Sequence, residues 1–270
     1  MTLPAVEIPL PLRHALELGE SVLFIGAGIG KHLHRPNGKG LPDAEGLARD
    51  IATHFSIDTT SDDLAKVAEL VQIRGRKNDL DDFIRKQFAE LTPDDTVKWL
   101  CSRRWRAIFT TNYDRGLERG YELLSDAPQQ PISISRTADL VHICLDFEVP
   151  VYHIHGTVFG EKQHIVISQS DYSNFREQRR MLFELLKKDL ATSTFLYIGY
   201  SNRDPNWNLL LNEITEEFLP SKLPRSYRVV PDTDRDDAEI LKAKGIESIN
   251  ASLEQFVAAT AAQLEQFHVD

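Results

Sequence analysis

Short apolar runs alternate with helical patterns along most of the chain. Val22–Ile25 is a continuous apolar run, which is typical of a strand buried on both faces of a parallel sheet. Further strand patterns lie at 107–111, 151–155 and 194–200, and each is followed by a polar loop, with helical spacing further along the chain. Strands that alternate with helices predict an α/β fold. We therefore expect a Rossmann-like, mostly parallel sheet with helices on both faces.

Weaker signals complete this alternation. Short strands are expected at 131–135, 165–168, 226–230 and 246–249. Helices are expected at 13–18, at 171–190, from Pro205 with Asp204 as its N-cap, at 234–244 and at the C-terminal end. The last helix places one apolar stripe on a single face, formed by Leu253, Phe256, Val257, Leu264 and Phe267.

The region from about 43 to 101 breaks the alternation, because it shows helical spacing with no strand between the helices. Leu47, Ile51 and Phe55 have this spacing, and similar sets follow further along the region. A regular βαβ fold would return to a strand sooner. We predict an inserted helical subdomain at 43–101 and a Rossmann-like domain formed by 1–42 and 102–270.

Composition narrows the class of protein. The chain has 270 residues and a formal net charge of −10, which disfavours a broad DNA-binding or RNA-binding surface. Its two cysteines, Cys101 and Cys144, are too few for a disulfide framework or a four-cysteine zinc site. The N-terminus lacks the basic segment of a signal peptide, and no apolar run approaches the roughly 18 residues of a membrane span. We expect a cytoplasmic protein without membrane contact.

The stretch SVLFIGAGIGK, residues 21–31, joins the first apolar run to three glycines, Gly26, Gly28 and Gly30. Glycines at the end of a strand allow a sharp turn and close approach of a ligand. The stretch matches neither the P-loop nor the GxGxxG dinucleotide fingerprint. Two interpretations stay open, a tight turn after a core strand or a nucleotide-binding loop.

Polar loops follow four of the predicted strands: the glycine loop, residues 110–114, His155 with Gly156, and residues 199–204. If the sheet is parallel, all four lie along one edge, where ligands bind in open α/β sheets. Each loop also has a structural explanation, such as a turn at Asn112, a buried histidine at His155 or a helix cap at Asp204. Four polar strand ends on one edge nevertheless favour a binding site.

His153 and His155 are two positions apart in a predicted strand, where alternate side chains share one face. Such a pair could ligate zinc. No acidic or cysteine partner has suitable ligand spacing, so we do not expect a metal.

Four motifs, GAGIG, TTNYD, HIHG and GYSNRDPNW, occur in this order, and together they resemble the sirtuin-like domains of bacterial anti-phage defence proteins. The resemblance extends from about residue 20 to 215 and includes a helical insert. It implies a Rossmann-like NAD site and NAD hydrolysis. By this resemblance, Asn112 and His155 are catalytic, with His155 as the base. Further residues implied in NAD binding are Gly26, Ala27, Gly28, Gly30, Asp114, Gly199 and Ser201.

Several departures separate the chain from sirtuin deacylases. Gly30 stands where many relatives have a serine, TTNYD replaces the usual QNID-type element, and the four-cysteine zinc module cannot be built. The resemblance therefore implies an NAD+ hydrolase that releases nicotinamide and ADP-ribose, with NAD as substrate and no metal. A non-catalytic NAD-binding or ADP-ribose-binding module is the alternative, and a protein deacylase is a weaker one. Control by homo-oligomerisation, or by a partner such as a HerA-type ATPase or a short Argonaute, is expected by analogy.

Overall fold

A seven-stranded sheet forms the centre of the protein, and all of its strands are parallel. The computed structural model describes residues 6–140, 143–160, 165–200, 205–218 and 223–265. The strand order is β5-β6-β4-β1-β7-β8-β9. These strands are β1 (Val22–Ile25), β4 (Ala107–Thr110), β5 (Gln130–Ile134), β6 (Glu148–His153), β7 (Phe195–Ile198), β8 (Ser226–Val230) and β9 (Ile246–Asn250). The α/β fold with a parallel sheet, predicted from the sequence, is confirmed.

Alternate side chains of the strands build a separate core on each face of the sheet. In β1, Val22 and Phe24 belong to one core, whereas Leu23 and Ile25 belong to the other. The core of Leu23 and Ile25 is covered by α1 (Leu10–Glu17), α5 (Asp95–Cys101), α6 (Gly116–Glu122) and α11 (Leu253–Glu265). The core of Val22 and Phe24 is covered by α7 (Gln169–Gln178), α8 (Arg180–Thr192), α9 (Pro205–Phe218) and α10 (Arg235–Ala243).

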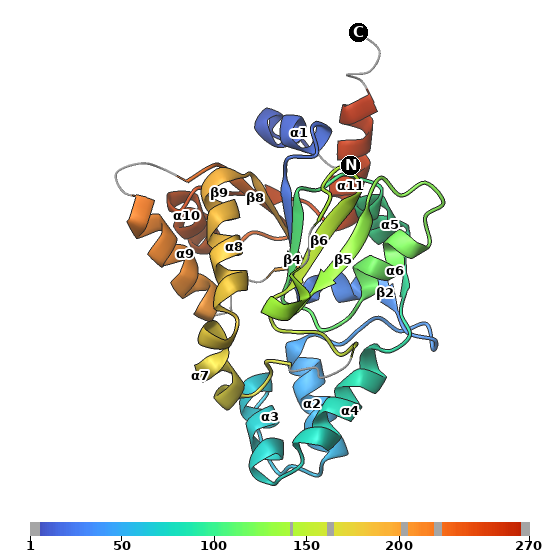
Figure 1. The fold of residues 1–270 in the computed structure, drawn as a ribbon, viewed down its shortest axis with the longest axis vertical. Helices are drawn as coiled ribbons and strands as arrows, with labels where there is room; N and C mark the ends of the chain where they lie inside the picture. The colour runs from blue at the N-terminus through green and yellow to red at the C-terminus, as the bar shows by residue number, and fades with distance from the viewer. Residues whose placement is uncertain (1–5, 141–142, 161–164, 201–204, 219–222, 266–270) are drawn as a thin grey trace.

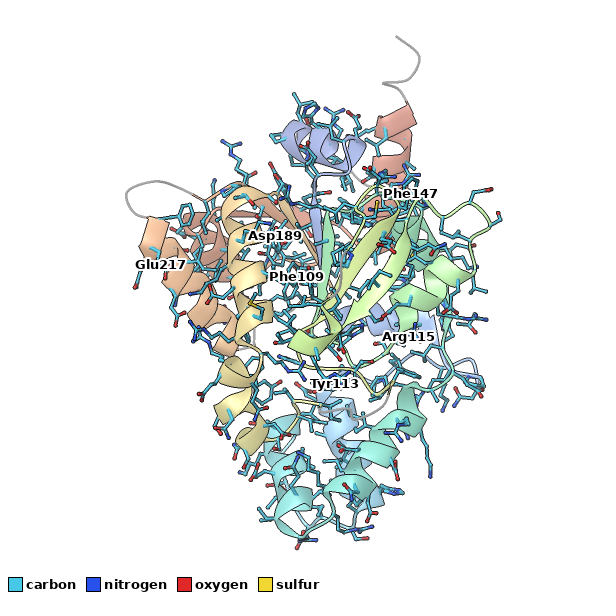
Figure 2. All side chains as sticks on the ribbon, viewed as in Figure 1. Phe109, Tyr113, Arg115, Phe147, Asp189 and Glu217 are labelled. Carbon is cyan, nitrogen blue, oxygen red and sulfur yellow. The ribbon has the colours of Figure 1, made fainter. Side chains whose placement is uncertain are left out.

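Three helices form a third core beyond the sheet. They are α2 (Ala44–His54), α3 (Leu64–Ile73) and α4 (Lys77–Phe88). In Figure 1 the strands run toward the end of the molecule that carries these helices. Their core includes residues of loops that follow β4 and β6: Tyr113, Val158, Ile165 and Ile167. Figure 2 shows Tyr113 between the sheet and the three helices. The carboxyl edge of the sheet therefore packs against this helical region.

Acidic N-caps explain where several helices begin. Asp43 accepts a hydrogen bond from the Gly46 amide at the start of α2, and Asp94 accepts from two amides at the start of α5. An oxygen at the N-cap satisfies main-chain donors that have no partner within the helix. At α7, Ser168 and Asp171 form a capping box. None of the helices in the described part of the chain is long and apolar enough to cross a bilayer.

Some predicted elements were wrong in detail. The segment 165–168, expected to be a strand, is irregular, and its apolar side chains are buried in the neighbouring cores. The expected single helix over 171–190 is two helices, because the chain leaves helical geometry at Arg179. The guanidinium of Arg179 is buried and donates to the main-chain carbonyls of Ser135 and His153.

The region between 33 and 101 also contains two short strands that the sequence did not indicate. β2 (Leu33–His34) pairs antiparallel with β3 (Thr92–Pro93) and joins the glycine loop to the far end of the predicted insert. Two residues are too few to show a period of alternating side chains, which explains why the pattern missed them. Helix α5, within the predicted insert, packs its apolar side chains into the core beside β1.

Candidate active site

The glycine loop after β1 packs directly on the loop after β7, main chain against main chain. The Gly28 amide donates to the Gly199 carbonyl at 2.8 Å. A side chain at Gly28 would place its Cβ 2.7 Å from the Gly199 Cα, and one at Gly26 would place it 2.5 Å from the Gly199 carbonyl oxygen. Gly199 itself has a φ of +65°, a left-handed conformation. Glycine is therefore required at all three positions by the contact between the two loops.

The predicted residues of the glycine loop differ in exposure. The chain forms a short 3-10 helix, Ala27–His32, immediately after Gly26. Ala27 and Gly28 are exposed at the carboxyl edge of the sheet, whereas Gly26 and Gly30 are buried. The Gly30 carbonyl accepts from the Leu41 amide at 3.0 Å. Ala27 and Gly28 are thus open to a ligand, whereas Gly30 is held inside the protein by its hydrogen bond with Leu41.

Asn112 lies in the loop after β4 and reaches across to the glycine loop. Its side-chain Nδ2 donates to the Gly26 carbonyl at 3.3 Å, and its main-chain N–H donates to Thr110 Oγ1 at 3.0 Å. The Thr110 carbonyl in turn accepts from the Ile154 amide of the neighbouring chain segment at 2.9 Å. The half-buried amide of Asn112 is therefore held between two strand ends.

Asp114 is buried beside Asn112, and both line a small cavity of about 10 Å³, roughly the space of one water molecule. Asp114 Oδ1 accepts from the Gly116 amide at 2.7 Å. Burial raises the pKa of the Asp114 carboxyl to about 6, helped by the negative charge of Glu118 and opposed by the Gly116 hydrogen bond. Asp114 thus changes its charge close to neutral pH.

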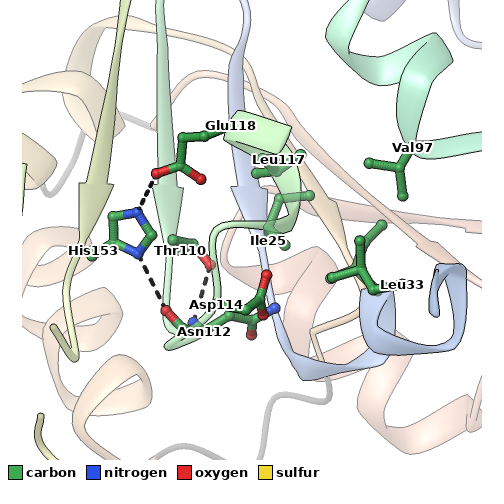
Figure 3. A pocket seen from close by; sticks show the side chains of 10 residues that line it. Ile25, Leu33, Val97, Thr110, Asn112, Asp114, Leu117, Glu118 and His153 are labelled. Atoms are coloured by element: carbon green, nitrogen blue, oxygen red, sulfur yellow. Dashed lines mark hydrogen bonds and ion pairs between the residues drawn. The ribbon is translucent and has the colours of Figure 1, made fainter. Parts of the chain in front are cut away.

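Glu118 and His153 also line this cavity, and neither was predicted as a site residue. Figure 3 shows His153 between Glu118 and the main chain of Asn112. His153 Nε2 lies 2.9 Å from Glu118 Oε1. The Ser133 hydroxyl donates to the same carboxylate oxygen. Burial opposes both charges, but mutual attraction outweighs it, so the pKa of Glu118 is lowered and that of His153 is raised.

His155 lies in the turn that follows β6, and it does not line the cavity beside Asn112. Its ring packs edge-on against Tyr172 and Phe175 of α7, with centroids 5.3 and 5.6 Å away. Its main-chain carbonyl accepts from the Val166 amide at 2.8 Å. The residue is 5% exposed. Helix α7 therefore holds one side of this histidine.

The expectation that His153 and His155 share a strand face was wrong. Strand β6 ends at His153, and the chain then turns, with the Gly156 amide donating to the His153 carbonyl at 3.0 Å. Within the ranges that the structure describes, no group of three or more His, Cys, Asp or Glu side chains could hold a metal ion. The predicted residue Ser201 and the predicted cap Asp204 lie outside the described residues.

A wider hollow of about 470 Å³ lies against the end of α4 and α6. Arg115 and Arg119 line it, together with Phe88 and Phe159. Both arginines pair with Glu122, at 4.0 and 2.9 Å. The hollow therefore has mixed charge and does not by itself indicate a ligand.

The four polar loops predicted from the sequence follow β6, β4, β1 and β7, which are consecutive neighbours in the sheet. Since these strands are parallel, their carboxyl ends meet at one edge, as expected. The fold and this edge define an α/β protein with a Rossmann-like ligand-binding edge. The chain belongs to the SIR2-like domain family, whose family model, described as "SIR2-like domain", matches residues 106–249.

Similar curated proteins carry the name NAD(+) hydrolase ThsA. The protein of this name from Enterococcus faecium is 28% identical over 205 residues, which cover 74% of this chain and 41% of that protein. The one from Cytobacillus dafuensis is 26% identical over 202 residues, covering 74% of this chain and 39% of that protein. The chain thus matches about two fifths of the length of these relatives.

Among solved structures, a mutant Sir2 homologue in complex with 2'-O-acetyl ADP ribose is 10% identical to the chain. The alignment covers 97% of this chain and 99% of that one, with a TM-score of 0.48.

Proposed function

We propose that this chain is a sirtuin-like NAD+ hydrolase that cleaves NAD+ to nicotinamide and ADP-ribose. The observation that carries the proposal is the meeting of Gly26, Asn112 and Asp114 at the carboxyl edge of a parallel sheet in a SIR2-like protein. The name of the relatives supports the same reaction, over the part of their length that the chain matches. The proposed site consists of catalytic Asn112 and His155, with binding by Gly26, Ala27, Gly28, Gly30, Asp114, Gly199 and Ser201.

The proposed reaction breaks the bond between the ribose carbon C1' and the nicotinamide nitrogen. The electron pair of that bond goes to nicotinamide, which neutralises its positive charge and makes it a good leaving group. Positive charge develops at C1', as in glycoside hydrolysis, and a water oxygen forms the new bond. His155 takes the proton of that water or of a ribose hydroxyl, and Asn112 orients the reacting groups through an uncharged amide.

The geometry around Asn112 suits this role. Its main-chain N–H and its side-chain Nδ2 are both engaged, so the amide is held in one orientation. Holding a reacting group in place supplies much of an enzymatic rate acceleration. Ala27 and Gly28 are exposed at this edge, so the pyrophosphate of NAD can approach the main chain of the glycine loop closely.

The Asn112→Ala variant tests the proposal directly. We expect it to lower the rate of nicotinamide release by at least about 10²-fold, because the amide that orients the reacting groups is lost. The measurement is chromatographic quantification of nicotinamide and ADP-ribose after incubation of the purified chain with NAD+. The matched control is Asn78→Ala, which removes an exposed asparagine of α4 and should leave the rate unchanged.

Each outcome of this assay separates the alternatives. Release of both products by the wild type and not by Asn112→Ala supports a hydrolase with this site. NAD+ bound tightly without any product favours a non-catalytic NAD-binding or ADP-ribose-binding module. NAD+ loss that requires an acylated peptide favours a deacylase. Equal rates in the wild type and in Asn112→Ala would remove Asn112 from the site.

The proposed biological role is depletion of NAD+ in anti-phage defence, in the cytoplasm. Uncontrolled loss of NAD+ would harm the cell, so the activity needs a control. We propose homo-oligomerisation or a partner protein as that control, with a HerA-type ATPase or a short Argonaute as examples. The assay should therefore be repeated over a range of protein concentrations, since an oligomer-dependent enzyme gains specific activity as its concentration rises.

A further inference from the structure

A buried ion pair lies directly beside Asn112, and the proposed reaction does not use it. Glu118 on α6 and His153 at the end of β6 are each 1% exposed. Two charged groups are costly to remove from water, and an apolar pair of similar volume is often as stable. Stability alone is therefore a weak reason for this pair to occupy the floor of the site.

Both ring nitrogens of His153 face oxygen atoms that accept hydrogen bonds. Nε2 lies 2.9 Å from Glu118 Oε1, and Nδ1 lies 3.3 Å from the main-chain oxygen of Asn112. A carbonyl and an ionised carboxylate have no proton to donate. While Glu118 is ionised, both contacts are hydrogen bonds together only when the imidazole carries a proton on each nitrogen. The carboxylate of Glu118 compensates the resulting positive charge.

The contact with His153 completes a set of three around Asn112. The main-chain N–H of Asn112 donates to Thr110 Oγ1, its side-chain Nδ2 donates to the Gly26 carbonyl, and its main-chain oxygen accepts from His153. These three partners come from β4, the glycine loop and β6. With all three bonds made, neither the main chain nor the side chain of Asn112 can rotate freely.

We propose that Glu118 and His153 are positioning residues, which hold the main chain of Asn112 through a doubly protonated imidazole and so fix the amide that faces the substrate. This inference rests on the proposed function. Ser133 and Arg115 support the carboxylate, the former by its hydroxyl and the latter from 3.8 Å. Arg179 donates to the main-chain carbonyl of His153 at 3.3 Å and so restrains the main chain of the histidine.

Two substitutions of His153 separate its two hydrogen bonds. Asparagine places an N–H near the position of Nδ1 and can still donate to Asn112, whereas glutamine places one near Nε2 and can still donate to residue 118. Both are made in the Glu118→Gln background, so that no unpaired carboxylate stays buried. Glu118→Gln alone lets the glutamine donate to Nε2 of a neutral His153, whose Nδ1–H still reaches Asn112.

The kinetic expectation follows from which bond is kept. Two variants should keep kcat for NAD+ hydrolysis within about 10-fold of the wild type. They are Glu118→Gln alone and the double variant that combines Glu118→Gln with His153→Asn. Glu118→Gln with His153→Gln should lower kcat by about 10²-fold with little change in KM, because displacement of a reacting group by about 1 Å costs that much. Thermal unfolding of the two double variants should be similar. A purely structural role would lower the activity of both in proportion to their loss of stability, and that result overturns the proposal.

A second measurement does not depend on NAD+. In the full chain labelled with 15N-histidine, we expect both ring nitrogens of His153 to carry protons at pH 7, with the signal assigned by its loss in His153→Gln. A lone pair on either nitrogen overturns the proposed pair. If the wild type shows a doubly protonated His153 but hydrolyses no NAD+, the proposed function fails while the hydrogen-bonded pair stands. The 15N measurement on the wild type also tests the proposed pair if a double variant does not fold.

Discussion

The carboxyl group of Asp114 has a pKa that is shifted toward neutral pH. Burial raises its pKa to about 6, from 3.8 for an exposed aspartate. As the pH is lowered, Asp114 therefore becomes protonated at a higher pH in the folded protein than in the unfolded chain. It follows that protonation of Asp114 favours the folded state as the pH falls from 7 toward 4, by about 2 kcal/mol over this range for a shift of this size.

The Asp114→Asn variant isolates this effect, because asparagine keeps an acceptor for the Gly116 amide and does not titrate. We expect the free energy of unfolding of the wild type, minus that of Asp114→Asn, to rise as the pH falls from 7 to 4. Urea unfolding at several pH values measures this difference. A difference that is constant or falls over that range would contradict an elevated pKa at Asp114.

At the scale of single residues, the sequence correctly predicted which loops meet at the carboxyl edge of the sheet, and the physical reason is clear. Gly26, Asn112 and Asp114 follow strands directly, so the parallel sheet brings them to one place. Glu118 and His153 meet through a contact between a helix and a strand, which no local pattern indicates. The sequence suggests a role for His153 only as a metal ligand, because it does not show which atoms a histidine ring faces.

At the scale of elements, the contact between the glycine loop and the loop after β7 fixes the shape of the carboxyl edge. Gly199 and Gly38 both have left-handed backbones, with φ of +65° and +77°. A Cβ at Gly38 would meet nothing within 4 Å, whereas one at Gly199 would lie 2.5 Å from the Ile29 main-chain nitrogen. Both positions therefore need a left-handed backbone, but only Gly199 is also packed too closely to hold a side chain.

We expect Gly38→Ala to lower the free energy of unfolding by about 1 kcal/mol, the conformational cost alone. Gly199→Ala should lower it by about 2–4 kcal/mol, because the added methyl group also forces the two loops apart. Urea unfolding of both variants measures the difference. Equal losses at the two positions would show that the close packing of the loops contributes nothing to stability.

The elements that the sequence predicted best are the strands formed by continuous apolar runs. The four central strands were located to within three residues at either end, since each is a buried apolar run. The strands β2 and β3 were missed because their pairing depends on the tertiary approach of two loops. The division of the chain into 1–42 with 102–270 and an insert at 43–101 stays a prediction, although α5 packs beside β1.

At the scale of the whole molecule, the core of α2, α3 and α4 continues into the site. Tyr113, which stands between Asn112 and Asp114, is buried in this core, and its hydroxyl donates to the Val166 carbonyl at 2.9 Å. Loosening the helical core should therefore disturb the site as well as the fold. The core around α10 gives a comparison, because it lies beside the edge strand β9.

Leu80→Ala in α4 and Leu241→Ala in α10 form a matched pair, since both leucines are buried. Each should lower the free energy of unfolding by about 2–5 kcal/mol. We expect only Leu80→Ala to weaken NAD+ binding as well, measured by calorimetry at a temperature where both variants are folded. Equal NAD+ affinities in the two variants would mean that the helical core does not support the site.

The order of strands in the sheet has a consequence for folding during synthesis on the ribosome. Strand β1 is made first, yet its two neighbours are β4 and β7, which begin at residues 107 and 195. The apolar strand β1 can be paired on both edges only after β7 has been synthesised. Pairings between strands so far apart in the sequence form slowly. An exposed apolar strand can associate with other chains during that wait. Production of this protein should therefore depend on chaperones and on a low rate of synthesis more than its finished fold suggests.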